Sequence, residues 1–152
     1  MTTVEDAPIT TERSMSQVVT DTVRTFRAQV PDCLVAALVD MSTGMLLAVD
    51  TLDDQQADED LDLLAAATFD LFQGRNVSII QNVFADRQAA PKSDRHYFQE
   101  MVVNSDDLVH VFLRSVRHQD LVAVVVCRRV TNLGMLFAQA RVVLKQMDAD
   151  FA

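Results

Sequence analysis

Glycine and histidine are scarce in this chain, and their scarcity argues against several kinds of chemistry. The 152 residues contain three glycines and three histidines. The chain has neither a P-loop nor a G-x-G-x-x-G loop, so it cannot hold a nucleotide by either glycine-rich device. His96, His110 and His118 lack the H-x-x-x-H and H-E-x-x-H spacings of zinc sites. We therefore expect neither a metal nor a cofactor.

Cysteine is scarce as well, and its placement indicates no paired chemistry. Cys33 and Cys127 are far apart in the sequence, and neither belongs to a C-x-x-C pair. Both stand in apolar runs that are typical of strands. We expect buried, reduced thiols rather than a disulfide or a nucleophile.

Long apolar runs are absent. The longest strongly apolar run, residues 121–127, is far shorter than the roughly 20 residues that a membrane span needs. Residues 1–12 lack the basic start and the apolar stretch of a signal peptide. We therefore expect a cytoplasmic protein with no membrane partner.

Basic side chains are too few to balance the acidic ones, and the net charge is −9. That balance argues against nucleic acid and anionic membranes as partners. Most of the excess lies in residues 1–70, which hold 14 acidic and three basic side chains. The clusters at 53–54 and 58–60 lack the spacing of a calcium loop, so we expect a solvated acidic face. Steering of a basic partner is the alternative.

The first third of the chain predicts a helix followed by a hairpin. Residues 14–17 have the spacing of a capping box, and Pro31 ends the helix that follows. Residues 33–39 are almost unbroken apolar sequence, as in a strand that is covered on both faces. Residues 40–44 form a turn in which Gly44 can take a positive φ, and residues 45–49 form the return strand. The apolar stripe of the helix consists of Met15, Val19, Val23, Phe26 and Val30.

The middle of the chain is helical and more apolar than one buried face requires. A helix begins at about Asp58, and Gly74 and Asn76 interrupt it. Residues 77–87 repeat the apolar pattern, so either one helix bends at Gly74 or two helices meet there. Residues 89–94 form a polar loop.

The last part of the chain predicts three strands, at residues 97–103, 108–114 and 121–127, and a final helix capped by Thr131 or Asn132. Two β-meanders around a helix favour one antiparallel sheet with helices on its faces, an α/β fold. We expect a flexible tail at 1–13 and a single domain at 14–152.

Three segments together resemble the roadblock/LC7 family, over roughly residues 16–147. They are the hairpin at 33–48 with its aspartate and glycine in the turn, the alanine-rich helix at 63–72, and the last strand running into Thr131-Asn-Leu-Gly134. The resemblance implies a five-stranded antiparallel sheet in order 2-1-5-4-3. It places the middle helix on one face and the first and last helices on the other. The segment from residue 74 to 96 is longer than is usual in the family.

The resemblance also implies a dimer in which the third strands pair and the middle helices pack side by side. It implies a regulator or scaffold for a Ras-like small GTPase, or an adaptor in a multiprotein assembly. The apolar surplus of this chain fits self-pairing, because an apolar edge strand is a hazard unless it is covered. The alternative is that segment 74–95 folds back and caps that edge within one chain. The predicted dimer interface consists of Phe69, Phe72, Ile79, Ile80, Val83, Phe84, Tyr97, Phe98, Met101 and Val103.

No catalytic constellation is present, and a G-x-S-x-G serine is absent. We expect a homodimeric interaction module that is not an enzyme; a small-molecule-sensing α/β module is the alternative. Two basic clusters, Arg114 with Arg117 and Arg128 with Arg129, should lie at opposite ends of the last strand. An arginine supplied in trans is how many GTPase activators work. Exposed, solvated arginines are the stronger interpretation.

Overall fold

The computed structural model describes residues 13–52, 58–88 and 96–151. The expected tail apart from Arg13, the segment 53–57 with its acidic pair at 53–54, and the loop at 89–94 lie outside these residues. The elements in chain order are α1 (Met15–Gln29), β1 (Cys33–Asp40), β2 (Met45–Thr51), α2 (Asp58–Gln73), α3 (Arg75–Gln88), β3 (Glu100–Asn104), β4 (Leu108–Arg114), β5 (Leu121–Arg128) and α4 (Leu133–Asp150).

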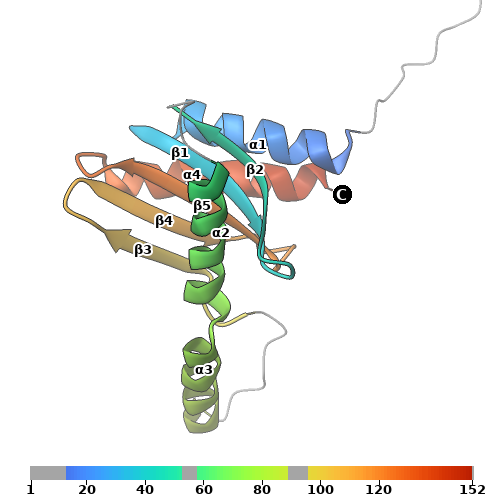
Figure 1. The fold of residues 1–152 in the computed structure, drawn as a ribbon, viewed down its shortest axis with the longest axis vertical. Coiled ribbons are helices and arrows are strands. Elements are labelled where there is room, and N and C mark those ends of the chain that lie inside the picture. The colour runs from blue at the N-terminus through green and yellow to red at the C-terminus, as the bar shows by residue number, and fades with distance from the viewer. Residues whose placement is uncertain (1–12, 53–57, 89–95, 152) are drawn as a thin grey trace, which may run out of the picture.

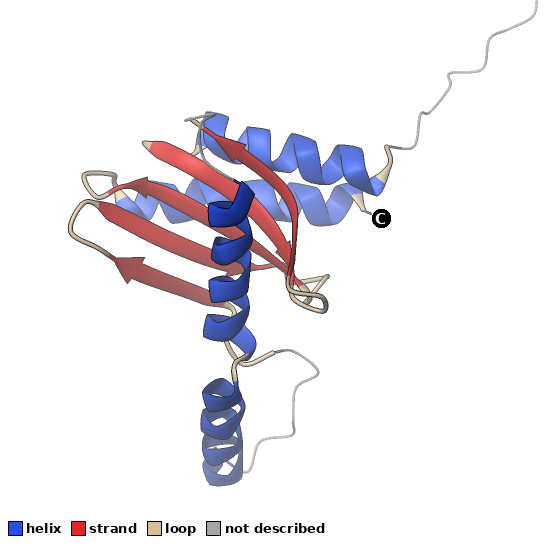
Figure 2. Ribbon diagram, in the orientation of Figure 1, coloured by secondary structure: helices blue, strands red, loops and turns tan. Residues whose placement is uncertain are grey.

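The strands form one antiparallel sheet in the order β2-β1-β5-β4-β3, so the expected fold class and strand order are confirmed. Helices α1 and α4 lie side by side on one face, and α2 crosses the other (Figure 1). The strands thus lie between two helical layers (Figure 2). The structure places β3 at one edge of the sheet.

Local sequence signals explain where α1 begins and ends. The Gln17 N–H donates to the Ser14 hydroxyl oxygen at 3.2 Å, and the Ser14 N–H donates to the Gln17 side chain at 2.9 Å. This reciprocal pair satisfies two amide groups that a helix start would leave without partners. The helix ends one residue before Val30, as the proline at 31 predicts. The expected capping box is confirmed.

The first hairpin closes through its polar turn. Gly44 has a φ of 72°, and the Ser42 N–H donates to the Asp40 carboxylate at 2.9 Å. Only glycine takes such a φ without steric cost, so the expected role of Gly44 is confirmed. Strand β2 then pairs with β1 in the expected antiparallel sense.

The central strands are covered on both faces, as their apolar runs predict. Leu38 of β1 faces α1 and α4, whereas its neighbours Ala37 and Val39 face α2. Strand β5 is buried throughout residues 121–127. Two separate apolar cores result, one on each side of the sheet.

The break at Gly74 separates two helices rather than bending one. A Cβ atom at this position would lie 2.4 Å from the carbonyl oxygen of Asp70, so a side chain does not fit the local backbone. Helix α3 projects beyond the sheet, whereas α2 lies across it (Figure 1). The described part of segment 74–95 therefore does not cover the β3 edge.

One predicted boundary is wrong. The strand expected at 97–103 begins only at Glu100 and ends at Asn104. The carbonyl oxygen of Phe98 accepts from Nε of Arg114 at 2.9 Å, and the backbone N–H of Arg114 donates to the Gln99 carbonyl oxygen at 2.8 Å. Regular pairing with β4 starts with Glu100 opposite Leu113.

Candidate interaction surface

Helix α3 carries four large apolar side chains that are 40–51% exposed. Ile79 is 51% exposed, Ile80 40%, and Val83 and Phe84 each 44%. Positions 79 and 83, like positions 80 and 84, are one helical turn apart and therefore share a side of the helix. These four residues all belong to the predicted dimer interface.

Tyr97 connects this helix to the sheet. Its ring stacks on Phe84 with centroids 6.4 Å apart and meets Phe98 at 5.0 Å. Tyr97 is 38% exposed, and Val103 of β3 is 40% exposed. We call the set Ile79, Ile80, Val83, Phe84, Tyr97 and Val103 the α3–β3 surface.

Phe72 does not belong to that surface, and its place in the predicted interface is corrected. It is 1% exposed, and its ring lies 5.9 Å from that of Phe112 of β4. Phe69, Phe98 and Met101 are partly buried and pack against the same core. Phe69 and Phe72 face this core from α2, and Phe98 and Met101 face it from the start of β3 and the residues before it. These contacts hold α2 and the beginning of β3 against the sheet.

Sequence reasoning missed a second exposed row, on α2 itself. Leu63 is 68% exposed and Leu71 39%, and Ala67 between them is exposed too. The spacing of four residues puts all three on one side of the helix, opposite the buried Ala65 and Phe72. The same spacing in the sequence was the signal that could have identified this outward row.

A polar cluster fixes the point where α2 ends and α3 begins. The Gln73 side-chain amide lies 3.2 Å from Nδ1 of His96, and the His96 N–H donates to the Gln119 side chain at 3.1 Å. Gln99 donates to the same Gln119 oxygen at 2.9 Å. The end of α2 is therefore tied to the segment before β3 and to the β4–β5 connection.

Arg114 lies at the centre of this cluster and is 2% exposed. Its guanidinium donates to the carbonyl oxygens of Phe98 and Gln119 and lies 5.1 Å from the centre of the Phe72 ring. Burial lowers the pKa of Arg114 to about 10, so it stays charged near neutral pH. Its Nη2 atom is buried with no hydrogen-bond partner among the described residues.

The two arginine clusters do lie at opposite ends of β5, as expected. Arg117, Arg128 and Arg129 are exposed. Arg114 is not, which corrects the expectation of a solvated side chain there. An arginine enclosed by its own chain cannot reach a partner in trans without unfolding this cluster.

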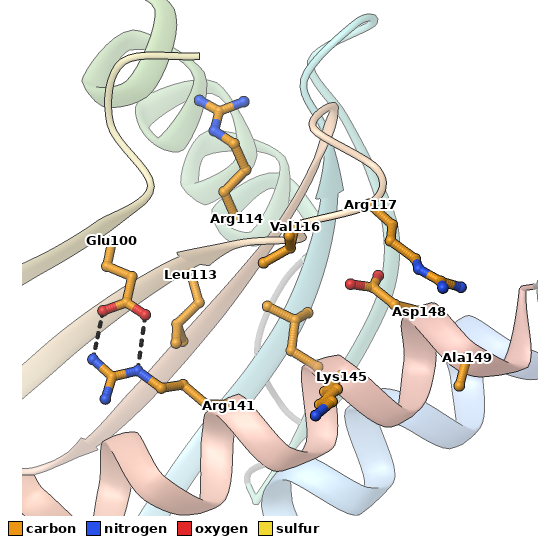
Figure 3. Close-up of a pocket in the computed structure, with 10 residues that line it drawn as sticks. Glu100, Leu113, Arg114, Val116, Arg117, Arg141, Lys145, Asp148 and Ala149 are labelled. Carbon is orange, nitrogen blue, oxygen red and sulfur yellow. Dashed lines mark hydrogen bonds and ion pairs between the residues drawn. The ribbon is translucent and has the colours of Figure 1, made fainter. Parts of the chain in front are cut away.

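A groove of about 470 Å³ lies between α4 and the β3–β4 edge (Figure 3). Leu113, Val116 and Leu144 supply apolar lining, and Arg117 and Lys145 supply positive charge. Figure 3 shows the Arg114 side chain pointing away from the groove toward α2.

Two carboxylates in this groove are already engaged. Glu100 accepts from Nε and Nη2 of Arg141 at 2.9 and 2.7 Å, and this hydrogen bonding holds the pKa of Glu100 below its ordinary value. Asp148 accepts from the hydroxyl of Ser115, which joins α4 to the β4–β5 connection.

Within the described ranges, no group of three or more histidine, cysteine, aspartate or glutamate side chains could hold a metal ion. Burial lowers the pKa of His110, a residue of β4.

Among the helices of the described segments, none has the length and apolar character to cross a membrane.

Comparisons with known proteins agree on the fold. No family model and no curated protein matches the sequence. Among solved structures, MglB of Myxococcus xanthus is similar with a TM-score of 0.66 and 16% identity, covering 91% of each chain. A roadblock/LC7 domain from Streptomyces avermitilis has a TM-score of 0.62 and 16% identity, covering 84% of this chain and 92% of that one.

An MglB structure with a tetrameric arrangement is similar too, with a TM-score of 0.63 and 16% identity over 91% of each chain. At this level of identity the likeness establishes the fold. The chain therefore has the roadblock/LC7 fold over most of its length.

Proposed function

We propose that this chain is a non-catalytic module that pairs with a second copy of itself through the α3–β3 surface. We propose further that the pair regulates or scaffolds a Ras-like small GTPase. The observation that carries the first part is the projecting helix α3, whose four apolar side chains are 40–51% exposed.

The free energy of exposure favours a cover for this surface. Burying a large apolar side chain fully contributes roughly 1.5–3 kcal/mol relative to leaving it in water. Contiguous exposed apolar residues of this kind mark interaction sites more often than free surface. The four side chains of α3 are 40–51% exposed, so about half of this free energy per side chain is still available to a partner that covers them.

A second copy is the partner that satisfies the sheet edge at the same time. Among the described strands, β3 pairs with β4 alone, so its other edge presents amide and carbonyl groups that a strand could pair with. A two-fold axis would place β3 beside its equivalent and use one surface twice. The outward row Leu63, Ala67 and Leu71 would then be free to pack against α2 of the second copy.

Insertion of a charge on α3 tests this interface. We expect Phe84→Asp and Ile79→Asp to weaken self-association by on the order of 100-fold, because each removes apolar burial and inserts a charge. The measurement is molar mass by light scattering across a concentration series. Val142→Asp is the matched control, since Val142 is 61% exposed but lies on α4. A wild type that stays monomeric at micromolar concentration would refute the dimer.

The GTPase part rests on the resemblance to the roadblock/LC7 family and on the fold shared with MglB. A regulator must distinguish the nucleotide states of its GTPase, since equal affinity for two states shifts neither. If a Ras-like GTPase is encoded beside this protein, that GTPase, loaded with GTP or GDP, is the material for a pull-down. We expect binding that differs between the two states. Equal or absent binding would count against regulation.

The groove favours a second candidate function, a sensor for a small molecule with an apolar body and an anionic group. Its volume lies within the range of small-molecule sites, and Arg117 and Lys145 would face the anion. Native mass spectrometry of the purified protein should then show a co-purifying molecule that Arg117→Ala with Lys145→Ala removes. A bare mass in the wild type would remove this candidate.

A further inference from the structure

The two cysteines lie directly opposite one another at the ends of two central strands. Cys33 of β1 is the register partner of Cys127 of β5. Both thiols are free and buried, as their apolar surroundings predict. Their meeting is a long-range consequence of the β1–β5 pairing, which their separation in the sequence does not indicate.

The hydrogen-bond pattern identifies the type of pair that they form. The Arg128 N–H donates to the Asp32 carbonyl oxygen at 3.1 Å, one residue outside the pair. In a regular antiparallel ladder this pattern marks a non-hydrogen-bonded pair, whose Cα atoms are about 4.5 Å apart and whose side chains are close. That spacing falls within the roughly 4.4–6.8 Å range of disulfides. The register of β1 and β5 shifts directly after this pair, between Cys33 and Val35.

The surroundings of Cys33 favour its thiolate over that of Cys127. The Cys33 thiol donates to the Val35 carbonyl oxygen at 3.4 Å. The neighbouring Cys127 thiol lowers the pKa of Cys33 against the effect of burial; Arg27 lowers it as well, whereas Asp50 raises it. The nearness of Cys33 and burial raise the pKa of Cys127. Arg27 also pairs with Asp50 at 3.4 Å, and its Nε atom is buried with no partner in the described chain.

Access follows the same order. Cys33 is 9% exposed at the start of β1, whereas Cys127 is completely buried. A small oxidant therefore reaches Cys33 first. A thiolate beside a cation, with a second thiol in contact, is the arrangement that reacts with peroxide and then resolves to a disulfide.

We propose that Cys33 and Cys127 form a peroxide-sensitive dithiol that closes into a disulfide across β1 and β5. The Cys33 thiolate attacks hydrogen peroxide; an S–O bond forms, the O–O bond breaks and hydroxide leaves. The Cys127 sulfur then attacks the Cys33 sulfur, the S–O bond breaks, and the departing hydroxide takes the Cys127 proton as water. The proton that Cys33 releases on ionising converts the first hydroxide to water, so two thiols are oxidised and one peroxide is reduced to two waters.

The disulfide would tie the first central strand to the last and enclose β2, α2, α3, β3 and β4 in one covalent loop. Closing so long a loop lowers the entropy of the unfolded chain and raises stability. The oxidised protein should therefore unfold at a higher urea concentration than the reduced protein, and dithiothreitol should reverse the change. This inference does not depend on self-pairing, because the cysteines lie in the core beneath α1 and α4.

The first test uses the wild-type protein. It is reduced, treated with hydrogen peroxide, quenched, denatured and alkylated with iodoacetamide before intact-mass measurement. We expect a chain lighter by two hydrogen atoms with no alkylated thiol, running at single-chain size on a non-reducing gel. Two alkylated thiols, or disulfide-linked chains, would overturn the proposal.

The order of the steps is tested with single variants in the presence of dimedone, which traps sulfenic acid. Cys127→Ala should accumulate a dimedone adduct at Cys33, and Cys33→Ala should give little adduct at Cys127. Arg27→Gln should slow disulfide formation without abolishing it. Equal trapping at both cysteines would contradict the assigned order. The wild-type measurement stands whether or not the variants fold.

Discussion

The sequence pattern places Phe72 at the dimer surface, whereas its side chain belongs to the core. Its ring packs against Phe112 and beneath the Arg114 guanidinium. We expect Phe72→Ala to lower the free energy of unfolding by about 3–5 kcal/mol, because it leaves a cavity and uncovers a buried charge. Urea denaturation measures this change.

Leu63→Ala on the same helix is the matched control, since Leu63 is 68% exposed. In a monomeric sample its effect should stay within about 0.5 kcal/mol. Similar losses for both variants would mean that Phe72 is not the residue that anchors α2.

The Glu100–Arg141 pair makes a prediction about acid. Because Arg141 lowers the pKa of Glu100 in the folded state, the stability from this pair is present above the ordinary value of 4.5. It is lost as the pH falls through the lower, folded-state pKa. Between pH 7 and pH 3 the urea midpoint of the wild type should therefore fall further than that of Glu100→Gln. Parallel pH profiles would show that the pair contributes nothing.

Helix boundaries and the central strands could be predicted because their signals are local. The capping box at Ser14, the turn glycine Gly44 and the apolar runs of β1 and β5 each act over a few neighbouring residues. The start of β3 could not be predicted in this way. It depends on contacts with the next strand, where the Arg114 side chain donates to the Phe98 carbonyl oxygen and the Arg114 N–H donates to that of Gln99.

The same distinction between local signals and long-range contacts holds for the residues of the candidate site. Periodicity identified the apolar residues of α3. It did not indicate that α3 leaves the sheet, nor that the Phe72 side chain lies buried between α2 and the sheet. Burial of Arg114 and the meeting of Cys33 with Cys127 both arise from contacts between distant segments. Such contacts leave no spacing signal in a single sequence.

The break between α2 and α3 depends on a missing side chain. Gly74→Ala would bring a Cβ atom to 2.4 Å from the Asp70 carbonyl oxygen, so the backbone must shift. We expect a loss of about 1–3 kcal/mol in the free energy of unfolding, as for other overpacked sites. Thermal and urea denaturation give the measurement.

Gly134→Ala is the control of the same chemical change. A Cβ atom at Gly134 would meet the Asn132 side-chain oxygen at an ordinary 3.4 Å, in the first turn of α4. Alanine there should be neutral or stabilise by up to about 1 kcal/mol. A Gly74→Ala variant that is as stable as wild type would show that the junction adapts.

For the whole molecule, self-pairing links stability to protein concentration. If only the folded chain pairs, a tenfold rise in concentration should add about 1.4 kcal/mol per mole of dimer and raise the melting temperature. Calorimetry over a hundredfold range of concentration measures this rise. Phe84→Asp should abolish it, whereas Val142→Asp should retain it. A melting temperature that is independent of concentration in the wild type would argue against the pair.

Helix α3 is joined to the body of the molecule near Gly74 and through the stacked rings of Phe84 and Tyr97. None of the described α3 side chains, residues 75–84, belongs to either core, so a change in the length of the helix leaves the packing of the sheet intact. The direction in which its apolar rows point is constrained, because each residue turns the helix by about 100°. Insertions or deletions of about seven residues, close to two turns, keep the apolar rows pointing the same way. Insertions or deletions of one or two residues rotate the apolar rows by about 100–200°, so the length of α3 can change only in steps of about two turns.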